Sequence, residues 1–157
     1  MTLQKGKLEH ETPDDDSQFR VDLVLSWQEE QIVDLYRAGG WWKEEMDSSK
    51  IKDLISGSFL FAVAISISTG RAVGMGRVIS DGIADAYIQD LVVLDDWRRS
   101  GVGKMILARL LEECRSKGIS WIGLIAEPGK EDFYRSLGFS PMPGHVPMLF
   151  SKDAGKC

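Results

Sequence analysis

The stretch that decides the fold is DLVVLDDWRRSGVGKMILARLLEEC, residues 90–114. It passes from an apolar segment through a turn containing Gly101 and Gly103 into a segment whose apolar residues recur every three or four positions. That spacing is the period of an amphipathic helix. A glycine turn between a strand and a helix leaves free backbone N–H groups at the positive end of the helix dipole, where an anion binds. The stretch therefore predicts a strand, an anion-binding turn and a helix in succession.

Further strands and helices are predicted on both sides of this stretch. β-rich runs predict strands over residues 20–26, 59–67, 72–80, 86–94, 119–126 and 148–151. Apolar periodicity and glycine stops predict further helices over residues 26–40, with Ser26 as the N-cap, 48–58 and 129–139. We expect the three runs between residues 59 and 94 to pair antiparallel. The strand at 119–126 follows a helical crossover, so we expect it to be parallel to its predecessor. This order predicts a mixed α+β fold, a sheet covered by helices.

A single domain is expected, because 157 residues are enough for one core and too few for two. Residues 1–19 are polar, acidic and without periodicity, which predicts a mobile N-terminal tail. We place the domain at residues 20–151 and a short C-terminal tail at 152–157.

Composition excludes some classes of function. The net charge of −5 argues against a general nucleic-acid binder, which needs excess Lys and Arg to neutralise phosphates. The N-terminus lacks the apolar core of a signal peptide, and the most apolar run, residues 59–67, is about half the length needed to cross a bilayer. Cys114 and Cys157 show neither metal-ligand spacing nor a disulfide framework. We therefore expect a cytoplasmic protein that binds no metal, membrane or nucleic acid.

The glycine turn does not fit the two common nucleotide motifs. A Walker A loop would need glycine where this chain has Arg98, and Ser or Thr where it has Met105. A dinucleotide fingerprint would need a small residue in place of Ile106. The turn thus keeps an anion site without the hydroxyl that binds magnesium.

The sequence resembles the GNAT superfamily of acyl-CoA-dependent N-acyltransferases. The resemblance rests on AYIQDLVVLDDWRRSGVGKMI (86–106), the helix after it, IGLIA (122–126) and FYRSLGF (133–139), in that order. Together these segments span a pattern of roughly residues 20–151. DLYRAGGWW (34–42) and GMGRVISDG (74–82) further resemble small bacterial or archaeal acetyltransferases.

The resemblance implies a mostly antiparallel sheet that splays between its fourth and fifth strands, with about four flanking helices and acetyl-CoA in the gap. The strand before the turn would carry a bulge, and pantetheine would run between its main chain and residues 124–127. The implied CoA-binding residues are Leu91, Val92, Val93, Arg98, Arg99, Ser100, Gly101, Val102, Gly103, Lys104, Phe133 and Tyr134. Helix N-terminal amides would bind the pyrophosphate without a metal, and glycines 101 and 103 would let the backbone approach it.

Acetyl transfer from a thioester to an amine needs an acid, a base and an oxyanion site. The resemblance implies that Tyr134 is the general acid for the leaving thiolate. We expect a backbone N–H near Val92 to stabilise the oxyanion. Asp90 is the strand carboxylate nearest the thioester end, and it is either the base or a carboxylate that is structural or orients the substrate. Further candidates for the base are Asp85, Glu127 and His145.

The resemblance implies that the amine is selected by the loop between the first two helices and by the segment near the last strands, here GGWWKEEMD (39–47) and SPMPGHVPM (140–148). The substrate-binding candidates are Trp41, Trp42, Tyr87, Glu127 and His145. The two tryptophans either form an apolar wall for an aryl or alkyl amine or pack in the core or in a dimer contact. The acidic residues beside them either favour a cationic acceptor or form a solvated loop.

The function predicted from the sequence is an N-acetyltransferase that moves an acetyl group from acetyl-CoA to a primary amine of a small molecule or peptide. The amine would attack directly in a ternary complex, and the enzyme would work as a monomer or a homodimer. The alternative is a non-catalytic acyl-CoA-binding sensor or interaction module of the same fold.

Overall fold

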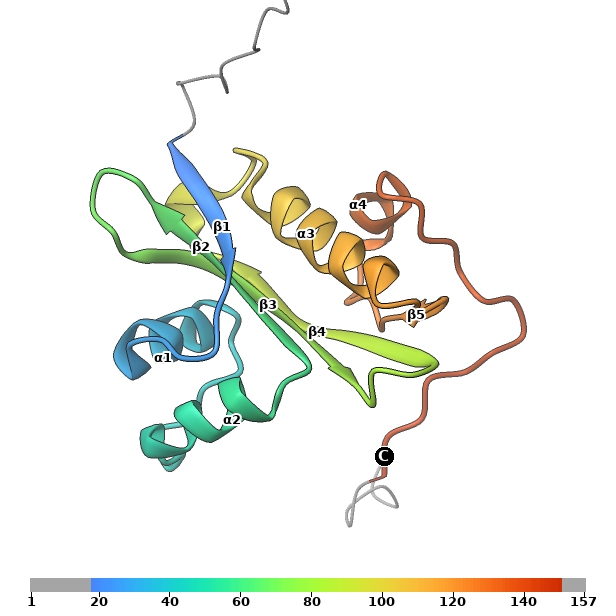
Figure 1. Ribbon diagram of the computed structural model, residues 1–157, viewed down its shortest axis with the longest axis horizontal. Helices are drawn as coiled ribbons and strands as arrows, with labels where there is room; N and C mark the ends of the chain where they lie inside the picture. The colour runs from blue at the N-terminus through green and yellow to red at the C-terminus, as the bar shows by residue number, and fades with distance from the viewer. Residues whose placement is uncertain (1–17, 151–157) are drawn as a thin grey trace, which may run out of the picture.

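The computed structural model describes residues 18–150 (Figure 1). The strands are β1 (Phe19–Leu23), β2 (Leu60–Ser66), β3 (Ala72–Ser80), β4 (Asp85–Val93) and β5 (Trp121–Gly123). The helices are α1 (Glu29–Ala38), α2 (Ile51–Gly57), α3 (Val102–Ser116) and α4 (Glu131–Arg135), with 3₁₀ turns at Ser48–Lys50 and Asp95–Trp97. The predicted C-terminal tail and residues 1–17 of the predicted N-terminal tail lie outside the described residues.

The strands form one sheet in the order β1-β2-β3-β4-β5. The first four strands pair antiparallel, and β5 pairs parallel with β4. This confirms the mixed α+β fold and the parallel crossover. The β4–β5 pairing covers three residue pairs, from Asp85 with Trp121 to Tyr87 with Gly123. Beyond Tyr87, β4 continues to Val93 while the segment after β5 leaves the sheet, so the two strands splay as expected.

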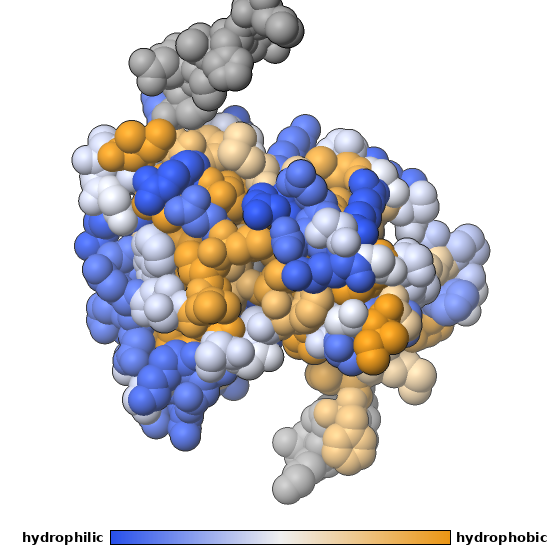
Figure 2. Space-filling view, viewed as in Figure 1, coloured by the Kyte–Doolittle hydropathy of each residue, from blue (hydrophilic) through white to orange (hydrophobic). Residues whose placement is uncertain are grey.

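Helices cover both faces of the sheet (Figure 1). Helices α1 and α2 lie on one face and α3 and α4 on the other, which explains why every residue of β2 is buried. On the α3 face, Ile106 and Leu110 are fully buried, and on the α1 face Ile32 and Leu35 are. The outward surface of α3 is hydrophilic, as its amphipathic period predicts (Figure 2).

Helix α3 lies close to β3 because β3 carries two glycines at the contact. A Cβ atom added to Gly74 would lie 3.0 Å from Ile106 Cδ1 and 3.0 Å from Val102 Cγ1. A Cβ on Gly76 would lie 3.0 Å from Ile106 Cγ2. These close approaches fix the beginning of α3 directly over the middle of the sheet.

The expected Ser26 cap of the first helix was wrong. The N-cap of α1 is Gln28, and its side chain accepts no bond from the helix backbone. Side chains organise the helix start instead, since Trp27 Nε1 donates to Gln31 Oε1 (3.1 Å) and Gln31 Nε2 donates to Gln28 Oε1 (2.6 Å).

Two predicted strands also differ from the structure. The apolar run at 119–126 pairs only over Trp121–Gly123, because the segment after Gly123 leaves the sheet. The expected strand at 148–151 has no strand partner over residues 148–150, where Met148, Leu149 and Phe150 are 92%, 88% and 94% exposed; residue 151 lies outside the described range.

Within residues 18–150, none of the helices has the length and apolar character needed to cross a membrane.

Candidate functional site

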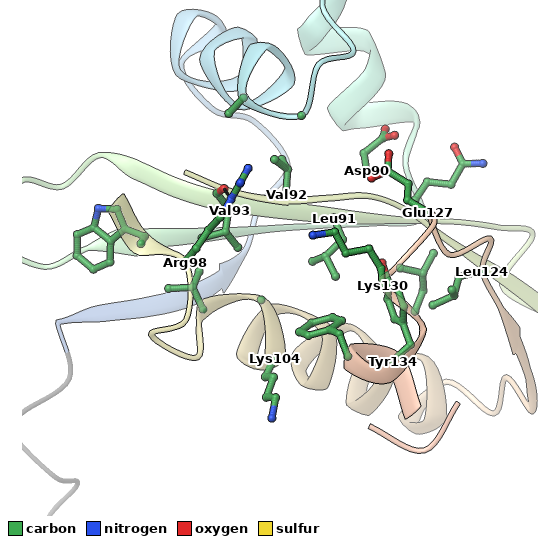
Figure 3. A pocket seen from close by; sticks show the side chains of 18 of the residues that line it. Asp90, Leu91, Val92, Val93, Arg98, Lys104, Leu124, Glu127, Lys130 and Tyr134 are labelled. Carbon is green, nitrogen blue, oxygen red and sulfur yellow. Dashed lines mark hydrogen bonds between the residues drawn. The ribbon is translucent and has the colours of Figure 1, made fainter. Parts of the chain in front are cut away.

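A cavity of about 1110 Å³ opens where β4 and β5 diverge (Figure 3). Its walls come from the end of α1, from β4, from the turn before α3, from the segment after β5 and from α4. The structure brings together these predicted site residues in its lining: Trp41, Tyr87, Asp90, Leu91, Val92, Val93, Arg98, Arg99, Gly101, Val102, Gly103, Lys104, Glu127, Phe133 and Tyr134. The splay therefore creates one cavity that most of the predicted residues share.

Four predicted site residues do not line this cavity: Trp42, Asp85, Ser100 and His145. The Ser100 hydroxyl is held inside the turn, where it donates to the carbonyl of Trp97 (2.5 Å). His145 is exposed in the segment after α4, with its Nδ1 3.0 Å from the carbonyl oxygen of Pro143. His145 belongs to the long segment after α4 (Figure 1), and it is not among the residues that line the cavity with the other candidates.

Sequence reasoning also missed five lining residues, namely Ala38, Ile88, Gln89, Trp97 and Lys130. One of them had a detectable signal. Lys130 precedes Tyr134 by four residues at the start of a predicted helix, and residues with that spacing share a helix face. The other four lie in positions where the sequence alone gives no direction to the side chain.

A β-bulge shapes the wall that β4 contributes. Met75 pairs with Val92 and Arg77 pairs with Gln89, so the two residues Asp90 and Leu91 face the single residue Gly76. Asp90 has a φ of 56°, in the left-handed region that Asp tolerates better than most residues. The bulge confirms the local distortion that the family resemblance implies, and it directs this part of the backbone toward the gap.

The carboxylate of Asp90 is held by two donors from other elements. The Tyr36 hydroxyl donates to Asp90 Oδ2 (2.7 Å), and Arg77 Nε donates to the same oxygen (2.5 Å). The Arg77 and Asp90 side chains are only 17% and 22% exposed. Burial, and then the charge of Asp90, raise the pKa of Tyr36 well above its usual value, so the phenol remains a donor. Asp90 therefore sits in a satisfied polar cluster at the edge of the cavity.

The turn before α3 places backbone donors at one end of the cavity. Arg99 has a φ of 63° and Gly101 a φ of 86°, and Gly101 is the N-cap of α3 without any side-chain cap. The first N–H groups of α3 therefore have no partner within the helix. The two glycines play different parts. Gly101 adopts a conformation that favours glycine in open space, whereas a Cβ at Gly103 would lie 3.3 Å from the ring of Phe133.

Basic side chains surround this turn in a chain that is acidic overall. Arg98 is partly engaged, with Nη2 2.9 Å from Asp95 Oδ1 and Nε donating to the carbonyl of Val93 (3.3 Å). Among the described residues, no carboxylate lies within ion-pair distance of Arg99, Lys104 or Lys130, which also line the cavity. The cavity is thus locally suited to an anion at the α3 end.

Tyr134 lies on α4 with its ring half-buried against Phe133 and Phe139. Its hydroxyl makes no hydrogen bond to another residue in the described part of the chain. Burial raises the pKa of Tyr134, and the nearby negative charge of Glu127 raises it further. The group is a protonated phenol with a free donor, on the wall opposite β4 (Figure 3).

A second contact joins two segments across the cavity mouth. Trp41 Nε1 donates to Glu127 Oε1 over 3.3 Å, linking the loop after α1 to the segment after β5. The Trp41 ring also packs edge-on against Tyr36, with ring centroids 6.2 Å apart. Glu127 is exposed and has no basic partner within ion-pair distance among the described residues, unlike Asp90.

Over residues 18–150, no group of three His, Cys, Asp or Glu side chains is placed to hold a metal ion.

Comparison with known proteins points to one family. A family model described as an acetyltransferase (GNAT) domain matches residues 57–141. The uncharacterized N-acetyltransferase ycf52 of Porphyra purpurea is 35% identical over 121 residues, which are 77% of this chain and 68% of that protein. The chloroplastic serotonin N-acetyltransferase 2 of Oryza sativa subsp. japonica is 41% identical over 81 residues, which are 52% of this chain and 40% of that protein. A probable acetyltransferase from meticillin-resistant Staphylococcus aureus has the same fold, with a TM-score of 0.72 over 85% of this chain and 98% of that chain at 20% identity.

Proposed function

The chain belongs to the GNAT superfamily of acetyltransferases, and we propose that it transfers the acetyl group of acetyl-CoA to a primary amine of a small molecule or peptide. The observation that carries the proposal is the cavity in the β4–β5 splay. One end of it offers backbone N–H groups and basic side chains, and the other offers a free phenol and a carboxylate. Such a cavity suits a long donor with an anionic end and a reactive end.

The residues of the α3 end fit the pyrophosphate of the donor. The open space at Gly101 and the uncapped first turn of α3 leave backbone N–H groups accessible from the cavity. Arg99 in the turn and Lys104 in the first turn of α3 add positive charge there. Along β4, the main chain of Leu91–Val93 faces a gap where β5 no longer pairs, which suits the amide groups of pantetheine.

Acetyl-CoA supplies an activated thioester, and the protein stabilises the charge that develops when an amine attacks it. We assign oxyanion stabilisation to a backbone N–H near Val92, because the bulge at Asp90 and Leu91 turns this backbone toward the cavity. Tyr134 then donates its proton to the leaving thiolate. Its raised pKa keeps it protonated at neutral pH, and its hydroxyl has no competing partner in the described chain.

We assign the proton acceptor to Glu127 in preference to Asp90. Both carboxylates line the cavity. Asp90 would have to release Tyr36 or Arg77 to accept a proton, whereas Glu127 holds only the N–H of Trp41 at 3.3 Å. Glu127 also lies near enough to Tyr134 for its charge to affect the phenol, so it faces the reacting end of the cavity. An arriving ammonium group would lose its proton to this carboxylate, directly or through water.

Replacing Glu127 with glutamine is expected to lower kcat/KM for the amine roughly 100-fold, the lower end of what a general base contributes. The affinity for acetyl-CoA should stay the same, because the glutamine retains the shape of the side chain. Glu131→Gln is the matched control, since Glu131 is exposed on α4 and does not line the cavity. Equal kcat/KM values for the two variants in a thiol-release assay would show that Glu127 is not the proton acceptor.

The acceptor is expected to carry an aryl or alkyl group beside its amine. Trp41 and Tyr87 place aromatic rings in the cavity lining, and Tyr87 in turn packs against Trp121 with ring centroids 6.1 Å apart. Aromatic faces bind both apolar groups and cations. That one relative is named a serotonin N-acetyltransferase supports an aromatic amine as one member of the class.

The two neighbouring tryptophans provide a matched test of the acceptor site. Both are half-buried, but Trp41 lines the cavity and Trp42 does not. Trp41→Ala is expected to raise KM for the amine roughly 3- to 10-fold through the lost aromatic contact, with the dissociation constant of acetyl-CoA unchanged. Trp42→Ala should lower the melting temperature and leave KM alone. The reverse pattern in steady-state kinetics would place the acceptor against Trp42.

A thiol-release assay with acetyl-CoA and a panel of amines tests the proposed function as a whole. The panel should contain aromatic ethylamines, aliphatic diamines, aminoglycosides and peptides with free N-termini or lysines. Turnover of at least one class supports the proposal. Tight binding of acetyl-CoA with no turnover of any class would instead support the non-catalytic acyl-CoA-binding module.

A further inference from the structure

Three elements meet at the bulge of β4 through one carboxylate. Tyr36 comes from α1, Arg77 from β3 and Asp90 from the bulge itself, and both donors bind the same oxygen, Oδ2. The separations along the chain are 54 and 13 residues, so the cluster is a tertiary contact that local structure does not require. It is well shielded, because Tyr36 is buried and the other two side chains are at most 22% exposed.

The bulge needs such an anchor because of its backbone conformation. An L-residue in the left-handed region is disfavoured, and only Gly, Asn and Asp adopt this region readily. Asp90 nevertheless has a φ of 56°, and the conformation persists where the surroundings hold the residue. The guanidinium of Arg77 and the hydroxyl of Tyr36 are the groups that hold it.

We propose that Tyr36 and Arg77 are positioning residues for acetyl transfer, and that Asp90 anchors the bulge and does not accept the substrate proton. By fixing the Asp90 carboxylate, they fix the direction of the Leu91 and Val92 backbone, which lines the cavity directly after it. This inference rests on the proposed function for its link to catalysis. Backbone donors aimed at a developing charge act mainly in the transition state, so loosening the anchor lowers kcat more than it weakens binding.

Two substitutions of Asp90 distinguish a residue that anchors the bulge from a residue that accepts the substrate proton. Asparagine retains an accepting oxygen and tolerates the left-handed region, whereas alanine does neither. If Asp90 is an anchor, Asp90→Asn should keep kcat within about fivefold, and its activity should still fall at low pH as that of the native protein does. Asp90→Ala should lower kcat tenfold or more. If the activity of Asp90→Asn no longer fell at low pH, Asp90 would be the group that takes the substrate proton, and the proposal would be overturned.

Tyr36→Phe tests the positioning role, because it removes one hydroxyl and keeps the buried ring. We expect kcat to fall about tenfold while the dissociation constant of acetyl-CoA stays within about threefold. Arg77→Gln should follow the same split. Arg20→Gln is the control, because Arg20 forms an exposed ion pair with Asp22 on β1, away from the cavity. A kcat within twofold of the native value for folded Tyr36→Phe would overturn the role, whatever its melting temperature.

A measurement that needs no turnover tests the anchor independently of the proposed function. In ¹H–¹⁵N spectra of the full chain, Tyr36→Phe should displace the amide signals of Leu91 and Val92, and Arg20→Gln should leave them in place. If the native protein turns over no amine, the proposed function fails while these spectra still test the anchor. Unchanged Leu91 and Val92 signals in Tyr36→Phe would overturn it.

Discussion

Replacing Gly101 with glutamate is expected to abolish the rise in melting temperature that acetyl-CoA gives the native protein. At a concentration 100 times its dissociation constant, a ligand stabilises the folded state by about 2.7 kcal/mol. For a domain of this size that shift is roughly 5–10 °C. The variant would place a carboxylate beside the uncapped amides of α3, where the pyrophosphate is proposed to bind, and the φ of 86° would strain any side chain there.

The strain of a left-handed residue has to be separated from the loss of the anion site. Gly70 provides the matched control, because it has a φ of 68°, has open space around it and lies in the β2–β3 turn outside the cavity lining. Gly70→Glu should lower the melting temperature of the free protein by a similar amount and keep the shift with acetyl-CoA. If thermal denaturation shows an undiminished shift for Gly101→Glu, the pyrophosphate does not bind at the α3 turn.

Replacing Tyr134 with phenylalanine is expected to lower kcat about 100-fold, because the departing thiolate loses its proton donor. The effect should lie at the lower end of the range for general acids, since a thiolate is a moderately good leaving group. The dissociation constant of acetyl-CoA should change little, because the ring contacts with Phe133 and Phe139 remain. Single-turnover kinetics and calorimetry measure the two quantities separately.

The pH dependence of the native enzyme gives a second view of the same residue. A general acid must be protonated, and both burial and Glu127 raise the pKa of Tyr134 above its usual value near 10. Activity that depends on Tyr134 is therefore present below that value and is lost only as the pH rises through the raised pKa. The kcat/KM profile should show no alkaline limb below about pH 10. An alkaline limb near pH 8 that persists in Tyr134→Phe would assign it to another group.

Much of the fold followed from local signals in the sequence. Short turns with glycine at 70 and 82 separate three β-rich runs, and these runs form β2, β3 and β4. The period of α3 placed its buried face correctly, since the apolar positions 106, 107 and 110 are fully buried. The extent of β5 did not follow, because its length depends on where the chain after Gly123 leaves β4 and not on its own apolar run.

The candidate site was predictable where backbone chemistry defines it and unpredictable where tertiary contacts do. The glycine turn could be placed because φ values and helix ends leave a sequence signature. The pairing of Asp90 with Tyr36 and Arg77 has no local signature, and it changes the reading of Asp90 from a free carboxylate to a held one. Trp41 and Trp42 also lack a local signature, because the sequence of two adjacent identical residues does not indicate which one lines the cavity.

The short pairing of β5 affects how the molecule opens. Three residue pairs join β5 to β4, whereas β2 and β3 pair along most of their length. Amide groups held by so few backbone bonds exchange through small local openings, so the part from β5 through α4 is expected to form a cooperative unit of low stability. Tyr134 belongs to that unit and the bulge belongs to the central sheet. Acetyl-CoA bound across the splay would contact both units. The local stability of the β5–α4 unit, which carries Tyr134, would then depend on the concentration of acetyl-CoA.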